Sequence, residues 1–323
     1  MCQICNKNYN NNTTELILNG CKNIIEIPNE LINLTYLDCS NTNIKILSDK
    51  FINLKFLNCS NTNIYSLSNK YINLELLNIS NTYIYLLPKI YINLKELYAD
   101  GCFLEKISKQ LINLEKIIIN NTNINKIKYY KNLKFLNCNY TYLNIIDTNT
   151  LNNLNYLICN NTLLEKLELS NHNKLIYLDC SNTNITSLPL FLNNLKYLNI
   201  SNTLIDNIEY NNLNNLQILY ASNTIINKLN NNLFYLVYLD LSNNKIIKKI
   251  PNTLTNLKYL NLSNTYNIKK ISKYINNLEY LDCNNSNIKH IPLILSNLFY
   301  LNINNTNIKY NNNLIYIDNN CNL

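Results

Sequence analysis

The chain has 323 residues with 28 lysines, no arginine and 20 acidic residues, for a net charge of +8. Hydrophobic residues make up 47% of it, which is enough for a large core and excludes a wholly disordered protein despite 76 asparagines. No apolar run approaches the ~18 residues of a membrane-spanning helix. The polar start has no apolar segment typical of a signal peptide, so we expect an intracellular, cytoplasmic protein.

Residues 1–12 are predicted to form a short N-terminal segment, and residues 13–323 a single repetitive domain. The repeat is clearest at 236–246, where it reads L-V-Y-L-D-L-S-N-N-K-I, and its positions are numbered from the first leucine. An atypical first repeat begins near Thr13 and a truncated last one at Leu314, which makes about sixteen repeats. Between them the frame restarts every 19 to 21 residues, at Leu34, Leu54, Leu74, Leu94, Leu114, Leu133, Leu154, Leu175, Leu195, Leu216, Leu257, Leu278 and Leu298.

Each repeat contains the pattern of one short strand. Positions 1, 4 and 6 are apolar, and positions 3, 5 and 7 alternate with them, as Tyr177 and Asp179 do with Leu178. This period of two predicts a half-buried strand. A second apolar pair, such as Ile185 and Leu188, closes the back of the repeat. Stacked repeats therefore predict a parallel sheet, with too little chain left for a full helix on the other side.

Position 8 is the most informative column. It is asparagine in twelve repeats, as at Asn41 and Asn182, and both glycines of the chain, Gly20 and Gly101, also occupy it. Asparagine and glycine share a tolerance of positive φ. We therefore predict that the chain leaves each strand through a left-handed residue here. Outside the truncated last repeat, Tyr140 is the one residue of another type in the column.

Two further polar columns flank the strand. Position 9 is threonine in eleven repeats and, outside the truncated last repeat, asparagine only at Asn244. A hydroxyl can bond to nearby backbone, but it has fewer donors than an amide. Another asparagine column stands just before position 1, as at Asn33 and Asn53, where we expect it to cap the loop that enters the strand.

The pattern resembles the L-x-x-L-x-L-x-x-N-x-L motif of leucine-rich repeat proteins over about 310 residues. The resemblance implies an α/β-type solenoid with a parallel β-sheet on its concave face. It implies a convex face of turns, extended chain and short 3₁₀ segments, with little α-helix. Repeats of this length with Ile-Pro or Leu-Pro in the return path are similar to the bacterial-type class. The composition is similar to such proteins from amoebae or their giant viruses, and a viral protein would work in the host cytoplasm.

No catalytic or metal-binding constellation emerges from the sequence. Cys2, Cys5 and Cys21 are candidate zinc ligands, but a structural zinc needs four. His172 and His290 stand far apart, without the partners of a triad. We therefore expect no enzyme, metal, cofactor or small-molecule substrate. Six cysteines occupy position 6 and are expected to pack in the core as reduced thiols, namely Cys39, Cys59, Cys138, Cys159, Cys180 and Cys283.

The candidate binding surface is the predicted concave face. Position 3 is aromatic in eleven of sixteen repeats, and aspartate or asparagine often stands beside it at position 5. Such a surface suits protein recognition, although stacked tyrosines also stabilise a sheet without any ligand. A second patch is predicted where the pattern breaks, at Glu96, Tyr98, Lys116 and Ile118, with a drifted repeat as the alternative. The predicted partner-binding residues are Tyr156, Tyr177, Asp179, Tyr197, Tyr238, Asp240, Tyr259, Tyr280, Asp282 and Tyr300.

We therefore predict a non-enzymatic scaffold that binds an unidentified protein through the concave face. The alternatives are a regulator or targeting subunit of a phosphatase, GTPase or ubiquitin ligase, and a structural component of a particle. No membrane partner is expected. Nucleic acid is disfavoured because the lysines are scattered and arginine, which has the planar fork used to read phosphates and bases, is absent.

Overall fold

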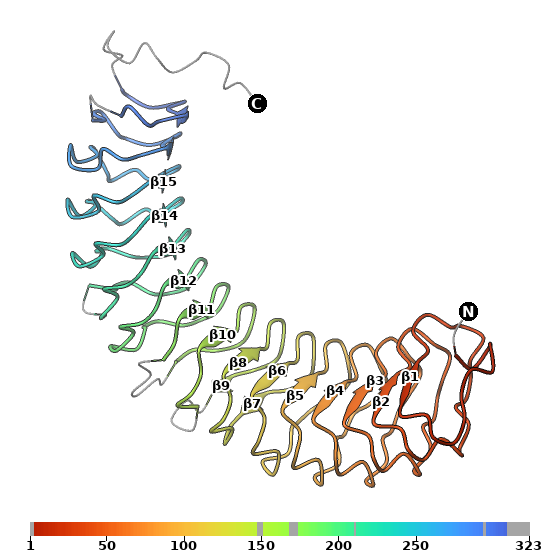
Figure 1. Ribbon diagram of the computed structural model, residues 1–323. Coiled ribbons are helices and arrows are strands. Elements are labelled where there is room, and N and C mark those ends of the chain that lie inside the picture. The colour runs from red at the N-terminus through yellow and green to blue at the C-terminus, as the bar shows by residue number, and fades with distance from the viewer. Residues whose placement is uncertain (1–2, 147–150, 168–173, 210, 293–294, 309–323) are drawn as a thin grey trace. The chain divides into compact units, whose positions relative to one another are not determined.

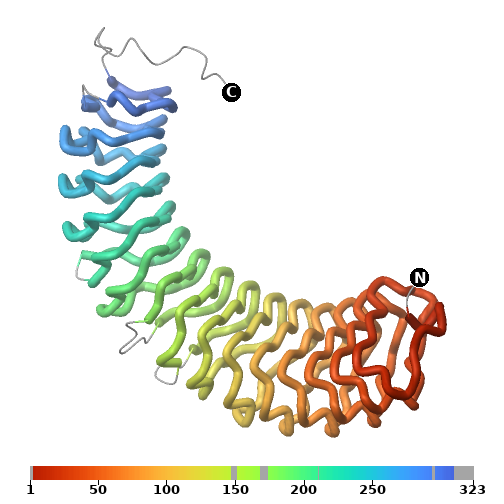
Figure 2. The backbone as a smooth tube through the Cα atoms, in the orientation of Figure 1, coloured from red at the N-terminus to blue at the C-terminus, as the bar shows by residue number. Residues whose placement is uncertain are grey.

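The computed structural model describes residues 3–146, 151–167, 174–209, 211–292 and 295–308. The chain divides into two compact units, an N-terminal unit of residues 1–163 and a C-terminal unit of residues 164–323. In each unit the repeats are successive coils stacked side by side (Figure 2). The single domain predicted for residues 13–323 stays a prediction.

One strand from each repeat of the N-terminal unit joins a parallel sheet (Figure 1). The strands pair in register, so Tyr36 lies beside Phe56 and Leu37 beside Leu57. Each strand is three residues long and covers positions 3 to 5, as predicted. In sheet order they are β1 (Glu15–Ile17), β2 (Tyr36–Asp38), β3 (Phe56–Asn58), β4 (Leu76–Asn78), β5 (Glu96–Tyr98), β6 (Lys116–Ile118), β8 (Phe135–Asn137) and β10 (Tyr156–Ile158).

The C-terminal unit repeats the same arrangement. Its strands are also parallel and in register, with Tyr238 beside Tyr259 and Leu239 beside Leu260. In sheet order they are β11 (Tyr177–Asp179), β12 (Tyr197–Asn199), β13 (Ile218–Tyr220), β14 (Tyr238–Asp240), β15 (Tyr259–Asn261), β16 (Tyr280–Asp282) and β17 (Tyr300–Asn302).

The core lies between the sheet and the return path of each coil. Position 4 points inward, and Leu57 and Leu239 are 0% exposed. The back pair closes the coil as predicted, since Ile185 and Leu188 are buried. All six cysteines at position 6 are buried, which confirms that they pack as core side chains.

The return path differs from the expectation in one respect. The described residues contain no 3₁₀-helix and no α-helix, so they also contain no helix that could cross a membrane. Single turns are present instead, such as the one closed when Phe51 N donates to Ser48 O at 3.4 Å. Because such turns do not follow one another, no helix grows from them. In one place the return path forms a small parallel sheet of β7 (Lys126–Ile127) and β9 (Ile145–Ile146).

The left-handed turn at position 8 is confirmed. All twelve asparagines of the column have φ between 50° and 60°, and Gly20 and Gly101 have φ of 76° and 62°. Tyr140 also has a φ of 54°, although it lacks the conformational tolerance of the other residues. The backbone conformation is therefore imposed by the stacked coils, and asparagine is the residue that adopts it most easily.

The asparagines before position 1 bind the neighbouring repeat and not their own. Asn53 donates from Nδ2 to the carbonyl of Ile32 at 3.1 Å, and Asn256 donates to the carbonyl of Phe234 at 2.8 Å. Each of these carbonyls belongs to the entry loop of the preceding coil. The column therefore forms a ladder of side-chain amides that ties one coil to the next, which corrects the expectation of a local cap.

The N-terminal segment covers the first edge of the sheet. Gln3 accepts a hydrogen bond at Oε1 from Ile17 N at 2.7 Å, and its Nε2 lies 3.5 Å from the carbonyl of Glu15. Ile17 and Glu15 belong to β1, whose backbone groups on that side have no neighbouring strand. A single side chain thus takes the place of a missing coil and satisfies an exposed strand edge.

Candidate functional site

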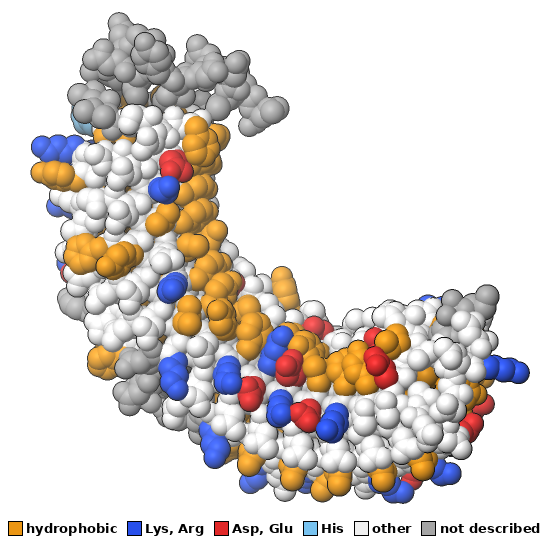
Figure 3. Space-filling view, in the orientation of Figure 1, with side chains coloured by type: hydrophobic (Ala, Val, Ile, Leu, Met, Phe, Trp, Pro, Cys, Tyr) orange, Lys and Arg blue, Asp and Glu red, His pale blue; other side chains and the backbone are white. Residues whose placement is uncertain are grey.

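Tyrosines form a stacked ladder on the sheet face of the C-terminal unit, the face that carries positions 3, 5 and 7. The rings of Tyr238 and Tyr259 have centroids 4.0 Å apart and planes 8° apart. Tyr280 continues the stack at 4.2 Å from Tyr259, and Tyr300 follows at 4.2 Å from Tyr280. The in-register parallel pairing causes this geometry, because it brings the same position of every strand side by side. Figure 3 shows a continuous hydrophobic band along this unit.

The ladder crosses a position where the sequence pattern breaks. β13 carries Ile218 in place of the aromatic residue at position 3. Tyr220, two residues further along the same strand, fills the gap, with its ring 5.7 Å from Tyr197 and 4.6 Å from Tyr238. Sequence reasoning missed Tyr220 as a site residue. The sequence could have indicated it, because Tyr220 is at position 5, and positions 3 and 5 of a strand point to the same face.

The ladder tyrosines expose ring edges and hydroxyls and cover their ring faces. Tyr177, Tyr197, Tyr238, Tyr259, Tyr280 and Tyr300 are all half-buried. Burial raises the pKa of the Tyr238 hydroxyl above its usual range, and hydrogen bonding with the neighbouring tyrosine hydroxyls adds to the rise. The same causes raise the pKa of Tyr197 and Tyr280. These three hydroxyls therefore stay neutral at physiological pH, and the row presents hydroxyl dipoles and ring edges to a partner.

The aspartates beside the ladder have a local structural role. Asp179 accepts hydrogen bonds at Oδ1 from Ser181 N at 3.0 Å and from Ser181 Oγ at 2.7 Å. Asp240 accepts from Ser242 N at 2.8 Å, and Asp282 accepts from Asn284 N at 3.0 Å. Asp179 and Asp282 are buried, with 8% and 9% exposure. Asparagines at position 5 make the same bond, as Asn199 does with Ser201 N, so the column holds the turn that follows each strand.

Among the described residues, the sheet face of the N-terminal unit carries short aromatic stacks. Tyr36 stacks on Phe56 with ring centroids 4.0 Å apart. Tyr156, the one predicted partner-binding tyrosine in this unit, tilts against Phe135 at 5.9 Å and is 41% exposed.

The predicted second patch is a bonded cluster of half-buried residues. The Tyr98 hydroxyl donates to Glu96 Oε2 at 2.6 Å, and Lys116 Nζ donates to the same hydroxyl at 2.9 Å. Lys116 also lies over the rings of Tyr98 and Phe135, at 4.8 and 5.5 Å from their centroids. Tyr98 and Ile118 are each half-buried, and Tyr98 is bonded to both charged residues, so the role of this patch in binding stays a prediction.

Position 2 of the N-terminal unit carries a row of alternating charges that the sequence reading missed. Lys95 pairs with Glu75 at 2.6 Å, and Lys134 pairs with Glu115 at 2.6 Å. The hydrogen bond and charge of Lys95 lower the pKa of the Glu75 carboxyl, and Lys55, which extends the alternation, adds to this. The sequence shows this row as charges of alternating sign that recur every 19 to 20 residues. Because these groups neutralise one another and are exposed, they add little binding energy.

The remaining candidates do not form a site in the described part of the chain. Cys2 and His172 lie outside the described residues. Within the described ranges, no group of three or more histidine, cysteine, aspartate and glutamate side chains gathers in a way that could hold a metal ion. Cys5 is exposed, and His290 is an exposed residue of the return path.

Comparison with known proteins identifies the fold. No family model matches the chain, and no curated protein matches its sequence. A leucine-rich repeat protein of Leptospira interrogans has a similar structure, with a TM-score of 0.79 and 25% identity over 91% of this chain and 84% of that one. The functional domain of InlJ from Listeria monocytogenes, which includes a cysteine ladder, has a TM-score of 0.74. Its sequence is 22% identical, and the match covers 93% of this chain and 65% of that one.

A plant structure is similar as well. It is the ectodomain of the Arabidopsis thaliana receptor kinase GASSHO1/SCHENGEN3 in complex with CASPARIAN STRIP INTEGRITY FACTOR 2, with a TM-score of 0.73 and 21% identity over 93% of this chain and 42% of that one. These likenesses and the parallel coils of about 20 residues define a leucine-rich repeat solenoid fold. The resemblance to amoebal and giant-virus proteins stays a prediction.

Proposed function

We propose that this protein is a non-enzymatic, intracellular scaffold that binds another protein through the sheet face of its C-terminal unit. The observation that carries the proposal is the tyrosine ladder, in which seven rings present their edges and hydroxyls in one row. Tyrosine provides large contact area for a small loss of side-chain entropy, and here stacking has already removed most of that entropy. A partner therefore meets a preorganised surface.

Leucine-rich repeat structures support this role, because such proteins are typically interaction proteins and the Arabidopsis ectodomain was solved with a bound factor. The burial of the aspartates reduces the contribution that we expect from their charge to binding affinity. Asp179 and Asp282 each have one oxygen engaged in a turn, so we expect the aromatic row to contribute more to affinity than the acidic flank. Nucleic acid, membrane and small-molecule partners are not part of the proposal.

The proposed centre of the surface is Tyr238, which is flanked by Tyr220 and Tyr259. Binding energy concentrates in a few aromatic anchors near the centre of an interface. The test uses purified protein as bait in an extract of the native cell, followed by titration of each captured protein. Replacing Tyr238→Ala together with Tyr259→Ala is expected to weaken binding by at least ~2 kcal/mol.

A matched control removes two tyrosines elsewhere in the same unit. Tyr266 and Tyr274 are 48% and 55% exposed and lie outside the strands, so Tyr266→Ala with Tyr274→Ala should leave binding unchanged. A Tyr238→Phe, Tyr259→Phe variant keeps the rings and measures the hydroxyls alone. If the Tyr238→Ala, Tyr259→Ala variant binds normally, or if the control variant loses binding, the ladder only stabilises the sheet.

The identity of the captured protein separates the remaining alternatives. A single stoichiometric enzyme would favour a regulatory or targeting role toward a phosphatase, GTPase or ubiquitin ligase. Several proteins of one particle would favour a structural role. Both outcomes are compatible with binding through the ladder, which the variants test independently.

A further inference from the structure

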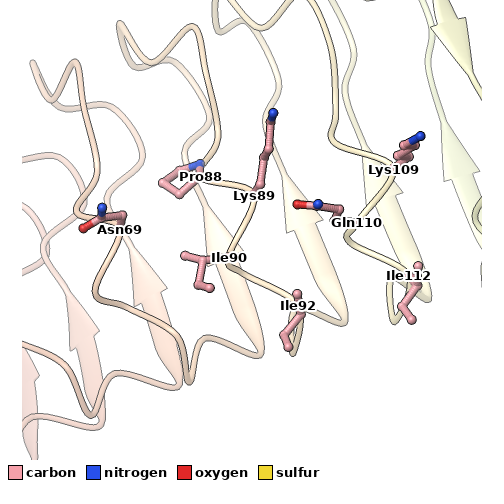
Figure 4. A pocket seen from close by; sticks show the side chains of 8 residues that line it. All are labelled: Asn69, Pro88, Lys89, Ile90, Ile92, Lys109, Gln110 and Ile112. Carbon is pink, nitrogen blue, oxygen red and sulfur yellow. The ribbon is translucent and has the colours of Figure 1, made fainter.

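The return path of the N-terminal unit contains a groove, on a different side of the coils from the sheet face. Its main cavity has a volume of about 820 Å³. A smaller cavity of about 270 Å³ adjoins it and shares Lys89, Lys109 and Gln110 with it. The main cavity spans three successive coils and is lined by Asn69, Pro88, Lys89, Ile90, Ile92, Lys109, Gln110 and Ile112 (Figure 4).

The groove exposes apolar side chains. Ile90, Ile92 and Ile112 are 45%, 48% and 46% exposed, and Leu86 beside them is 51% exposed. The buried ring of Tyr91 lies next to Ile90 and Ile92 in the sequence and anchors their loop to the preceding coil, because its hydroxyl donates to Ser68 O at 2.7 Å. The loop that presents these isoleucines is therefore fixed from within.

An apolar ridge extends the groove along the N-terminal unit. The residue two places before position 1 is isoleucine in five consecutive repeats, and each of the five side chains is 46–48% exposed. In the next repeats the same column is Lys131 and Asn152, so the apolar ridge ends. Its members are Ile32, Ile52, Ile72, Ile92 and Ile112.

The charge of the groove has one sign. Lys89, Lys106 and Lys109 line the two cavities, and none of the described lining residues is a carboxylate. No ion pair among the described residues involves these three lysines, whereas Lys70, one coil earlier, pairs with Asp49 at 2.6 Å. Three positive groups surround the exposed isoleucines. The groove is therefore complementary to a partner segment that carries negative charges beside apolar side chains.

We propose that this groove docks an acidic amphipathic helix of a partner protein. Apolar residues of the helix would pack on Ile90, Ile92 and Ile112, while its carboxylates would pair with Lys89 and Lys109. The dimensions are comparable, because the paired strands of neighbouring coils lie ~4.8 Å apart and one helical turn rises ~5.4 Å. Residues spaced i, i+3, i+4 and i+7 on the helix thus meet successive isoleucines of the ridge.

A membrane surface fits the same unit less well. Glu30 and Asp49 are exposed carboxylates at the entry loops of the coils that carry Ile32 and Ile52. Because Lys50 and Lys70 offset these two carboxylates, the first coils of the ridge carry no net positive charge that would attract an extended anionic lipid surface. The excess of positive charge lies at the end of the ridge around Lys89 and Lys109, which suits a short acidic segment.

The test uses the full chain and two synthetic, fluorescently labelled helical peptides. Both have leucines at i, i+3, i+4 and i+7, and the flanking positions are glutamate in one and glutamine in the other. Fluorescence anisotropy should show that the glutamate peptide binds at least ~10-fold more tightly. Lys89→Glu with Lys109→Glu should remove this preference, and Ile92→Ser with Ile112→Ser should weaken both peptides. All four residues are exposed, so we expect the variants to fold, and thermal unfolding checks this.

Matched controls lie in the C-terminal unit. Lys248→Glu with Lys249→Glu and Ile225→Ser with Ile246→Ser also change exposed residues, and they should leave peptide binding intact. The proposal is overturned if the two peptides bind equally, if the groove variants bind as the unaltered chain does, or if only vesicles of phosphatidylserine bind. None of these outcomes affects the tyrosine ladder, so the two proposals fail independently.

Discussion

Asn244 and Thr224 join two neighbouring coils through a buried hydrogen bond between their side chains. Thr224 donates from Oγ1 to Asn244 Oδ1 at 2.7 Å, and its backbone N donates to the same oxygen at 3.1 Å. Asn244 also donates from Nδ2 to Ala221 O in the preceding coil at 2.7 Å and to Leu241 O in its own coil at 2.8 Å. One amide at position 9 thus satisfies backbone groups of two coils.

Thr224 is the exception among the threonines at this position, because the other described threonines bond to a carbonyl of their own coil. Thr42 donates to Cys39 O at 2.7 Å and Thr265 to Leu262 O at 2.6 Å, and Thr183 does the same with Cys180 O. The links between coils come instead from the asparagines before position 1 and from those at position 8, such as Asn202, which donates to Asn182 Oδ1 at 2.8 Å. The side-chain hydrogen bonds that join neighbouring coils therefore lie mainly at the exposed edges of the coils and not inside them.

The contrast between Asn244 and the threonines gives a first prediction. Asn244→Thr should keep the local bond to Leu241 O and lose all three hydrogen bonds to the preceding coil. Ala221 O would keep the bond from Thr224 Oγ1 at 3.1 Å, but the buried Thr224 N would lack the partner that Asn244 provides, which we expect to cost ~1–3 kcal/mol of unfolding free energy. Urea unfolding measures the change. Thr265→Ser, which retains its local bond, should cost less, and equal costs for the two variants would contradict the inferred link.

The two glycines should respond differently to substitution. Gly20→Ala places a side chain at positive φ with no atom within 4 Å, so only backbone strain of ~1–2 kcal/mol is expected. At Gly101 an added Cβ would also lie 2.5 Å from Asn81 Oδ1, so Gly101→Ala should destabilise more. Gly20→Asn should cost least, because asparagine tolerates this conformation. Denaturant midpoints rank the three variants, and a larger loss at Gly20 than at Gly101 would refute the explanation.

Core packing at position 4 gives a third prediction. Leu239 in β14 is 0% exposed, and Leu239→Ala should cost ~2–5 kcal/mol by leaving a cavity. Lys245→Ala, an exposed change in the same repeat, should have little effect on the same unfolding curve. A small loss at Leu239 would indicate that neighbouring coils can collapse into the space.

Alkaline pH should weaken the C-terminal unit. Burial and neighbouring hydroxyls raise the pKa of Tyr238 and Tyr280 in the folded chain. The unfolded chain therefore loses these protons first, and the stability contribution is present below about pH 10 and declines as the pH rises beyond it. Urea midpoints measured across this range should fall less steeply in a Tyr238→Phe, Tyr280→Phe variant. Parallel curves for the two proteins would contradict the assignment.

Much of the fold could be predicted from periodicity, as particular residues show. Leu178, Cys180 and Ile185 occupy apolar columns, and all three are buried. The positive φ of Asn41 and Gly101 could be predicted because asparagine and glycine share one conformational property. The absence of 3₁₀ segments from the described residues could not be predicted, because whether isolated turns merge into a helix depends on how each coil packs on the next.

The sequence by itself determined which residues face the core, where each coil turns and which face carries the tyrosines, since these depend on local alternation and on backbone tolerance. Only the tertiary structure decided what those tyrosines and their neighbours contact. Tyr220 fills the gap at Ile218, Asp179 is turned into its own loop, and Lys89 and Lys109 meet exposed isoleucines across adjacent coils. Each of these contacts joins residues of one coil to the turn or coil beside it. Their geometry is therefore set by the stacking of repeats and not by the order of residues within one repeat.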